Sequence, residues 1–242
     1  MTKPDFPPLN PKVVLGVAAH PDDLDFAAAG TMALFASQGA AVHYLILTDG
    51  GKGSHDRKVT PAEVVRTRQA EQRAAADAIG AKDVQFLAYP DSCLEVTQQL
   101  KKDIVKTIRT LKPDVVIAMD PSMFYSAERG FINHPDHRAA GQATLDAVFP
   151  LARDYLSFPE LDEQGHKPHE VTTVLLTNFD RNEYCVDITS TIDKKMAAIA
   201  AHASQFSDLP AIKQYMKERA HTFGQKVGCE YAECFVRIDV QP

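Results

Sequence analysis

Short apolar runs and helical patterns alternate along the first 150 residues of the chain. A continuous apolar run at residues 13–18 is typical of a strand buried on both faces, and further strands are expected at 42–47, 84–87 and 115–118. Between and after them, apolar residues recur with helical spacing over residues 25–38, 60–79, 96–111 and 135–149. This alternation predicts a parallel β-sheet with helices packed on its faces.

Local signals mark where several of these elements begin and end. Thr60-Pro61-Ala62-Glu63 has the form of a capping box with proline at the first helical position, which predicts a helix start. Gly39 and Gly80 are placed where helices are expected to stop. Polar segments at 48–58 and 120–133 are expected to be loops.

The pattern changes after residue 150. A polar segment covers residues 151–169, and strands are expected at 171–176, 186–188 and 235–240, with helices at 192–206 and 209–226. The predicted fold class is therefore α/β: a Rossmann-like parallel sheet flanked by helices, with a small C-terminal α+β portion. We expect one domain over 1–242, in which 12–150 form a doubly wound core and 151–242 shape the cleft.

Composition narrows the function classes. With 242 residues and 45% hydrophobic residues, the chain buries a large core without help from a metal or disulfides. A net charge of −6 and scattered lysines and arginines argue against nucleic-acid binding. No apolar run is long enough to cross a bilayer, so we expect no membrane insertion.

The compartment is predicted from two further features. The first eleven residues are proline-rich and lack the apolar segment of a secretory signal. The four cysteines, which form no CxxC pair, are expected to be reduced, and the protein is expected to be cytoplasmic. These cysteines are Cys93, Cys185, Cys229 and Cys234.

Two similar tetrapeptides follow predicted strands that should be neighbours in the sheet. Each alone also fits an ordinary helix N-terminus, where a carboxylate complements the helix dipole. Together they place imidazoles and carboxylates at the carboxyl ends of parallel strands, where such sheets bind ligands. His20, Asp23 and His137 would then supply three zinc ligands and leave one position open, the pattern of a catalytic site. The tetrapeptides are His20-Pro21-Asp22-Asp23 and His134-Pro135-Asp136-His137.

These motifs give the chain a resemblance to the PIG-L/LmbE family of zinc-dependent N-deacetylases. The resemblance spans nearly the whole chain, and the combination of AHPDD with HPDH is its specific part. It also rests on segments at 48–54, 68–71, 186–189, 202–205 and 228–233.

The resemblance implies a role for each matching position. It implies one Zn²⁺ per chain, with Fe²⁺ as an alternative, held by His20, Asp23 and His137. It implies Asp22 as the general base and His134 as an imidazolium that stabilises the oxyanion.

Three further positions and the wider function follow from the same likeness. Asp136 would orient His134, while Arg68 and Asp91 would hold the substrate. The implied activity is deacetylation of an N-acetylglucosamine-type amino sugar or conjugate, and the implied assembly is a homo-oligomer.

Some positions depart from the family pattern where substrates are recognised. Ile132 stands where some members have a tyrosine that acts as an acid, and Tyr125 and His202 are hypothetical substitutes. Asp91-Ser92 replaces a more usual Asp-Gly pair. The sequence therefore leaves the substrate, the acyl group and the proton donor to the leaving amine open.

Alternative functions remain at this point. One is a zinc amidase acting on a non-sugar or thiol-conjugate amide. Another is a non-catalytic metal-binding protein, which would tolerate loss of Asp22. A third is a nucleotide-binding Rossmann-like protein, although the turn after the first strand lacks GxGxxG, and its carboxylates would repel a pyrophosphate.

Overall fold

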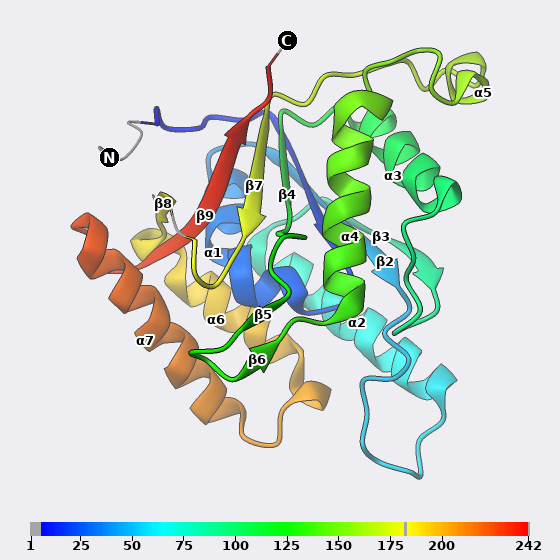
Figure 1. Ribbon diagram of the computed structural model, residues 1–242. Helices are drawn as coiled ribbons and strands as arrows, with labels where there is room; N and C mark the ends of the chain where they lie inside the picture. The colour runs from blue at the N-terminus through cyan, green and yellow to red at the C-terminus, as the bar shows by residue number, and fades with distance from the viewer. Residues whose placement is uncertain (1–5, 182, 242) are drawn as a thin grey trace.

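The computed structural model describes residues 6–181 and 183–241. Its main sheet has seven strands in the order β3-β2-β1-β4-β7-β9-β8 (Figure 1). The first five strands in that order are mutually parallel, whereas β9 runs antiparallel to both β7 and β8. The strand bounds are β1 Val13–Ala18, β2 Ala41–Thr48, β3 Asp83–Tyr89, β4 Val115–Met119, β7 Thr173–Thr177, β8 Tyr184–Asp187 and β9 Ala232–Asp239.

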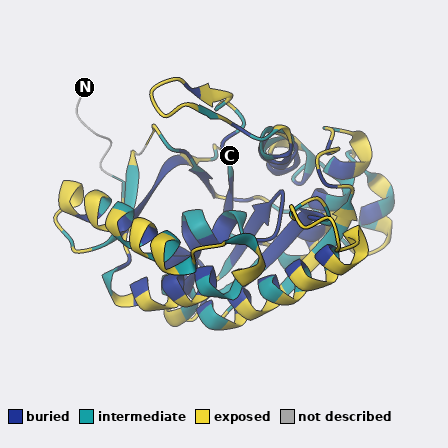
Figure 2. Cartoon of the chain, turned by 90° about the horizontal axis from the view of Figure 1, so that it is seen from below, coloured by how far each residue is buried: buried dark blue, intermediate teal, exposed yellow. Residues whose placement is uncertain are grey.

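Helices cover both faces of this sheet and bury two hydrophobic clusters. One cluster joins the sheet to α1, α2, α6 and α7, and the other joins it to α3 and α4. In Figure 2 the strands are buried, while the outward faces of the helices are exposed. The helix bounds are α1 Asp23–Ser37, α2 Pro61–Ile79, α3 Gln98–Leu111, α4 Pro135–Asp146, α5 Pro159–Glu163, α6 Ile192–Ala201 and α7 Leu209–Val227.

The predicted fold class is confirmed. β1 and β4 are neighbours, as the doubly wound pattern requires, and the C-terminal strands extend the same sheet. The capping box is also confirmed, because Thr60 Oγ1 accepts from the Glu63 N–H and Glu63 Oε2 accepts from the Thr60 N–H.

Three predicted elements differ from the structure. The segment 120–133 contains a two-stranded hairpin, β5 (Tyr125–Ser126) and β6 (Phe131–Ile132), too short for an alternating pattern to reveal. The helix predicted to reach residue 149 ends at Asp146 and passes into an irregular π-helical turn, since Pro150 lacks the N–H needed to continue it. Similarly, α6 stops at Ala201 rather than at residue 206, before a short 3₁₀ turn.

The cysteines also differ in part from expectation. Cys185 and Cys234 occupy paired positions on β8 and β9 and form a disulfide, so the prediction that all four thiols are reduced is wrong for this pair. Cys93 and Cys229 are free. Among the described residues, no helix combines the length and hydropathy that a bilayer span requires.

A buried ion pair connects the C-terminal part to α1. Lys195 on α6 contacts Glu233 on β9, and both side chains are almost fully buried. Glu233 accepts from the N–H groups of Gly30 and Thr31, and Lys195 donates to the carbonyl of Phe26. The pair therefore binds backbone groups in the middle of α1, the helix that begins at Asp23.

Helix α4 approaches the end of β4 very closely. A Cβ added to Gly141 would lie 2.3 Å from the Met119 carbonyl oxygen, which is backbone and cannot move aside cheaply. Only glycine allows this approach, which fixes the position of the whole helix relative to the sheet.

We expect Gly141→Ala to lower the free energy of unfolding by about 1–3 kcal/mol, because overpacking outweighs the gain in helix propensity. Urea unfolding followed by circular dichroism measures this change. Gln142→Ala, at the exposed neighbouring position, is the control and should stay within about 0.5 kcal/mol of the original protein. Equal stability of the two variants would show that the helix does not depend on this contact.

Candidate metal centre

The two tetrapeptides meet at the carboxyl edge of the sheet. His20 follows β1, and His134 caps the start of α4, which follows β4 and the hairpin. A third segment, after β3, brings Asp91 to the same edge. The predicted gathering of these segments is therefore observed, because β1 lies next to β4 in the sheet.

His20 is the centre of the cluster. Its Nε2 lies 3.2 Å from Asp136 Oδ2 and 3.4 Å from Asp91 Oδ1, while its Nδ1 lies 3.5 Å from Asp23 Oδ2. Burial alone would lower the pKa of His20, but the surrounding carboxylates outweigh it and raise that pKa to about 12. The imidazole thus lies in a strongly negative environment that favours a cation.

His137 faces the same carboxylate from the other side. Its Nε2 lies 3.1 Å from Asp23 Oδ1, and its Nδ1 lies 3.0 Å from Asn133 Oδ1. Each oxygen of Asp23 therefore faces one imidazole. Although burial opposes ionisation, the two imidazoles hold the pKa of Asp23 well below its usual range.

This buried His/Asp cluster could bind a metal ion. Potential donor atoms of His20, His134 and His137 lie within 4.8 Å of one another, as do those of His20, Asp91 and Asp136. Nitrogen and oxygen donors of this kind suit Zn²⁺ and Fe²⁺ alike.

The side chain of Asp136 contacts His20, whereas the family resemblance implies that it orients His134. Its carboxylate contacts His20 and accepts from the N–H groups of Ser92 and Leu94. Only its backbone N–H reaches His134, donating to Nδ1 at 3.2 Å. Asp136 thus contacts His20 through its carboxylate and His134 through its backbone N–H, and it links three loops of the site.

The backbone at the start of α4 orients the ring of His134. Because Nδ1 accepts from the Asp136 N–H, the ring proton lies on Nε2. Burial, reinforced by the nearby His20, lowers the pKa of His134, which disfavours the imidazolium expected from the resemblance.

Asp22 occupies a strained turn between β1 and α1. Its φ of 92° lies in the left-handed region, which is unfavourable for residues other than glycine and often marks functional sites. Gln72 accepts from the Asp22 N–H at 2.8 Å, and Arg68 Nη2 lies 3.2 Å from Oδ2. Burial and the neighbouring Asp23 raise the pKa of Asp22 to about 6.

Arg68 and Asp91 are both buried, although the sequence predicts that they hold the substrate. Arg68 donates to the carbonyls of Pro21 and Gly50, and so secures the loops on either side of Asp22. Asp91 accepts from the Lys52 N–H at 2.9 Å in addition to its contact with His20. Their contacts within the protein position loops of the site.

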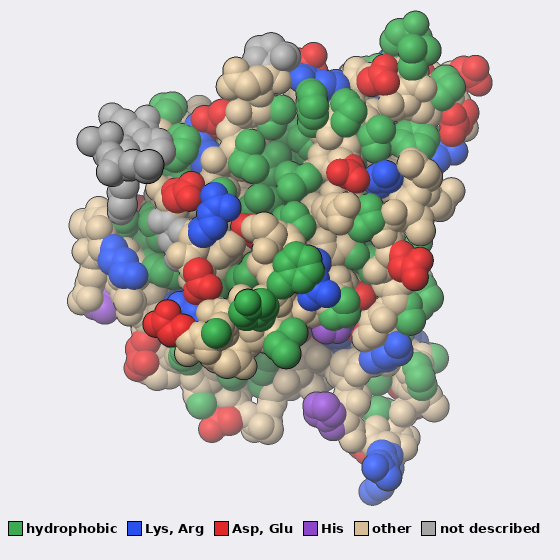
Figure 3. Space-filling view, in the orientation of Figure 1, with side chains coloured by type: hydrophobic (Ala, Val, Ile, Leu, Met, Phe, Trp, Pro, Cys, Tyr) green, Lys and Arg blue, Asp and Glu red, His purple; other side chains and the backbone are tan. Residues whose placement is uncertain are grey.

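A cavity of about 220 Å³ adjoins Asp22, Asp23 and His137. Its walls come from α1, the hairpin region, α7 and β9, and are mostly apolar. Figure 3 shows hydrophobic side chains gathered over the β5–β6 hairpin on this face of the molecule, where Phe124, Tyr125 and Ile132 are 59%, 69% and 82% exposed.

Neither hypothetical proton donor lines this cavity. Tyr125 lies on the exposed hairpin, paired with Ile132. His202 is completely buried, with Nε2 2.8 Å from Asp25 Oδ2. His202 therefore belongs to the network of Asp25 and Gln72 behind the turn of Asp22.

Sequence reasoning missed several residues of the site. Asn133 could have been found because it directly precedes the second tetrapeptide. Gln72 could have been found because it lies one turn of α2 beyond Arg68. Arg219, which lines the cavity from α7, lies outside every motif.

Comparisons with known proteins agree with this fold and identify a family. A family model described as GlcNAc-PI de-N-acetylase (PIG-L) matches residues 15–148, which is more than half of the chain. The diacetylchitobiose deacetylase of Thermococcus kodakarensis is 31% identical over 228 residues, covering 92% of this chain and 81% of that protein.

Two further proteins show the range of relatives. The structure of N,N′-diacetylchitobiose deacetylase from Pyrococcus horikoshii has a TM-score of 0.86 and 29% identity, covering 95% of this chain and 85% of that one. The 4-oxalmesaconate hydratase of Pseudomonas putida is 28% identical over 199 residues, covering 80% of this chain and 74% of that protein. From the matched family model, the 31% identical relative and the shared fold, we conclude that this chain belongs to the PIG-L/LmbE family.

Proposed function

We propose that this protein is a zinc-dependent N-deacetylase acting on an N-acetylglucosamine-type amino sugar or conjugate. One observation carries the proposal: His20 Nδ1 and His137 Nε2 each face one oxygen of the Asp23 carboxylate, and Asp22 lies beside them. Membership of the family and likeness to diacetylchitobiose deacetylases support the acetyl group and the amino sugar.

The proposed metal ligands are His20, Asp23 and His137. The second nitrogen of each ring is already held, by Asp136 for His20 and by Asn133 for His137, which leaves the nitrogens facing Asp23 free to bind a metal. Such outer contacts fix the tautomer and ring orientation of metal-binding histidines. When bound, the metal supplies Lewis acidity, polarising the amide carbonyl and acidifying a water molecule.

Asp22 and His134 complete the proposed chemistry. Asp22 takes the water proton and is held for this by Gln72 and Arg68. The Nε2–H of His134 donates to the oxygen that becomes negative as the amide is attacked, and it does so as a neutral ring. Asp22 then carries a proton that can pass to the leaving amine.

A second reaction shares these groups. Addition of water to a carbon–carbon double bond also needs a base and a polarised carbonyl, and the hydratase of Pseudomonas putida is a relative. We favour deacetylation, because the more similar proteins are deacetylases. A substrate assay separates the two reactions, since only deacetylation releases acetate.

The first test measures acetate release from a panel of N-acetylated amino sugars, with added zinc and after chelation. We expect release that depends on the metal and falls about 100-fold or more in Asp22→Asn, since a general base typically contributes 10²–10⁴-fold.

Two measurements make this test decisive. Metal analysis of Asp22→Asn should show an unchanged zinc content, and Asp56→Asn in the exposed loop should retain full activity. Full turnover by Asp22→Asn would refute the role of the base. Water addition to an unsaturated acid in place of acetate release would overturn the deacetylase proposal.

A second test concerns the orientation of His20. We expect Asp136→Asn to weaken zinc binding about 10–100-fold, as loss of a partner behind a metal-binding histidine usually does. Competition with a chromogenic chelator measures the affinity. Asp146→Asn at the far end of the same helix is the control and should bind zinc normally; equal affinity of both variants would contradict the role of Asp136 in orienting His20.

A further inference from the structure

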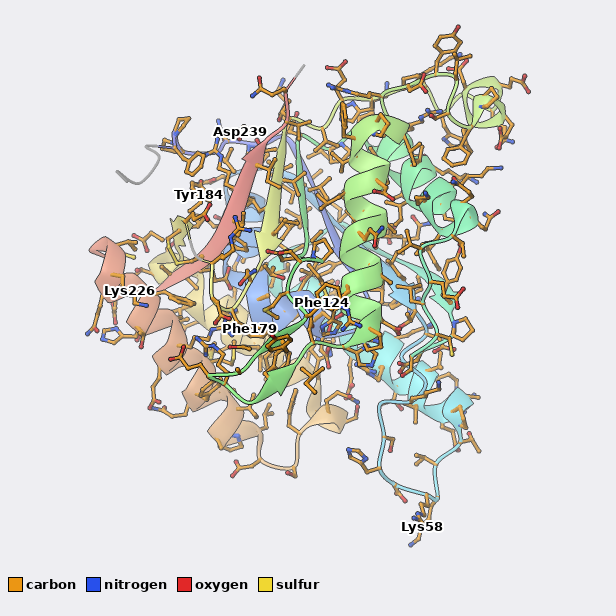
Figure 4. All side chains as sticks on the ribbon, in the orientation of Figure 1. Lys58, Phe124, Phe179, Tyr184, Lys226 and Asp239 are labelled. Atoms are coloured by element: carbon orange, nitrogen blue, oxygen red, sulfur yellow. A yellow bond between two sulfur atoms is a disulfide. The ribbon has the colours of Figure 1, made fainter. Side chains whose placement is uncertain are left out.

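Arg219 lines the cavity and differs from the other charged residues there, because it has no hydrogen-bond or ion-pair partner among the described residues. It projects from α7 into the space that also borders Asp22 and Asp23. Its guanidinium carbon lies 4.9 Å from the ring centroid of Phe179 and 5.4 Å from that of Phe223. In Figure 4, Phe179 lies between α7 and the β5–β6 hairpin.

The carboxylates that share the cavity with Arg219 already have other partners. Glu233 is bound by Lys195 and by two backbone N–H groups of α1. Asp120 accepts from Asn178 and from Ser122. Asp22 faces Arg68 instead.

Arg219 itself has none of these partners. Across residues 6–181 and 183–241, no hydrogen bond or ion pair involves its guanidinium, which contacts two aromatic rings. Burial lowers the pKa of Arg219, with Arg129 adding to this effect, yet an arginine side chain stays protonated in proteins. The side chain is partly buried, and among the described residues no carboxylate pairs with it directly, so its guanidinium is available to an anionic ligand in the cavity.

We propose that Arg219 recognises a carboxylate on the substrate. The cavity between the His/Asp cluster and α7 would then hold the apolar part of the molecule that carries this carboxylate. The inference rests on the proposed function and narrows its substrate class. Phe26, Met119, Met123 and Phe131 line the path from Asp22 and provide apolar contact for such a group.

A carboxylate suits this position better than a neutral group. The guanidinium is planar and matches a carboxylate with two parallel hydrogen bonds. The two neighbouring aromatic rings lower the local polarity, which strengthens the attraction of the guanidinium for an anion. A methyl group alone would leave both the charge and most of the 220 Å³ unused.

The first arm of the test measures binding without turnover. Isothermal titration compares phenylacetate with the neutral 2-phenylethanol on the zinc-loaded protein, on Arg219→Gln and on Arg219→Lys. We expect Arg219→Gln to bind phenylacetate at least tenfold more weakly than the original protein, and Arg219→Lys to bind it with an intermediate affinity, because an ammonium group keeps the charge but cannot make two parallel hydrogen bonds. The matched control is Lys217→Gln, which removes another cation of α7 that lies over an aromatic ring but outside the cavity.

The second arm locates the carboxylate. One pair of substrates, N-succinyl- and N-butanoylglucosamine, places the charge on the acyl side, and another, N-acetylmuramate and N-acetylglucosamine, places it on the amine side. We expect the original protein to prefer the charged member of one pair in kcat/KM, and Arg219→Gln to reduce that preference at least tenfold.

The outcomes separate this inference from the proposed function. Loss of phenylacetate binding in Arg219→Gln supports the inference even if no amide is hydrolysed, whereas metal-dependent hydrolysis with equal phenylacetate binding in all variants overturns it alone. Equal weakening in Lys217→Gln would also overturn it, because the effect would then be one of general charge. If Arg219→Gln does not fold, Arg219→Lys still decides, since it should bind phenylacetate more weakly than the original protein while binding 2-phenylethanol equally well, and unchanged phenylacetate binding would overturn the inference.

Discussion

The contact between His20 and Asp136 joins two segments that are 116 residues apart in the sequence. It places an imidazole from the end of β1 against a carboxylate from the first turn of α4, and the same carboxylate receives two N–H groups from the loop after β3. Three sheet-edge loops are thereby fixed around one ring. The orientation of that ring determines which nitrogen faces Asp23, and hence whether a three-ligand metal site can form.

The sequence predicted much of this arrangement for a clear reason. Buried parallel strands appear as continuous apolar runs, and a parallel sheet brings the ends of its strands together, so His20 and His137 could be placed near each other before any coordinates. The hairpin at Tyr125 and Ile132 could not be predicted, because two residues per strand carry no period. The disulfide of Cys185 and Cys234 depends on the register between β8 and β9, which spacing along the chain does not determine.

Side-chain partnerships were harder to predict than positions. The motif order suggested that Asp136 serves its neighbour His134, but the geometry of a helix start turns its carboxylate toward His20. Arg68 and Asp91 also lie near the cluster, as expected. Their side chains, however, form hydrogen bonds with backbone groups of neighbouring loops. Arg219 carried no sequence signal, since only the folded chain shows that a lysine or arginine lacks a counter-ion.

The Lys195–Glu233 pair connects the start of the candidate site to a distant part of the chain. It binds backbone groups in the middle of α1, and Glu233 lies on the last strand of the sheet. Helix α1, which begins at Asp23, therefore depends on side chains of α6 and β9 that lie far away in the sequence. A change that loosens β9 from the sheet removes these contacts and can disturb the turn of Asp22 and Asp23, although β9 carries none of the proposed metal ligands.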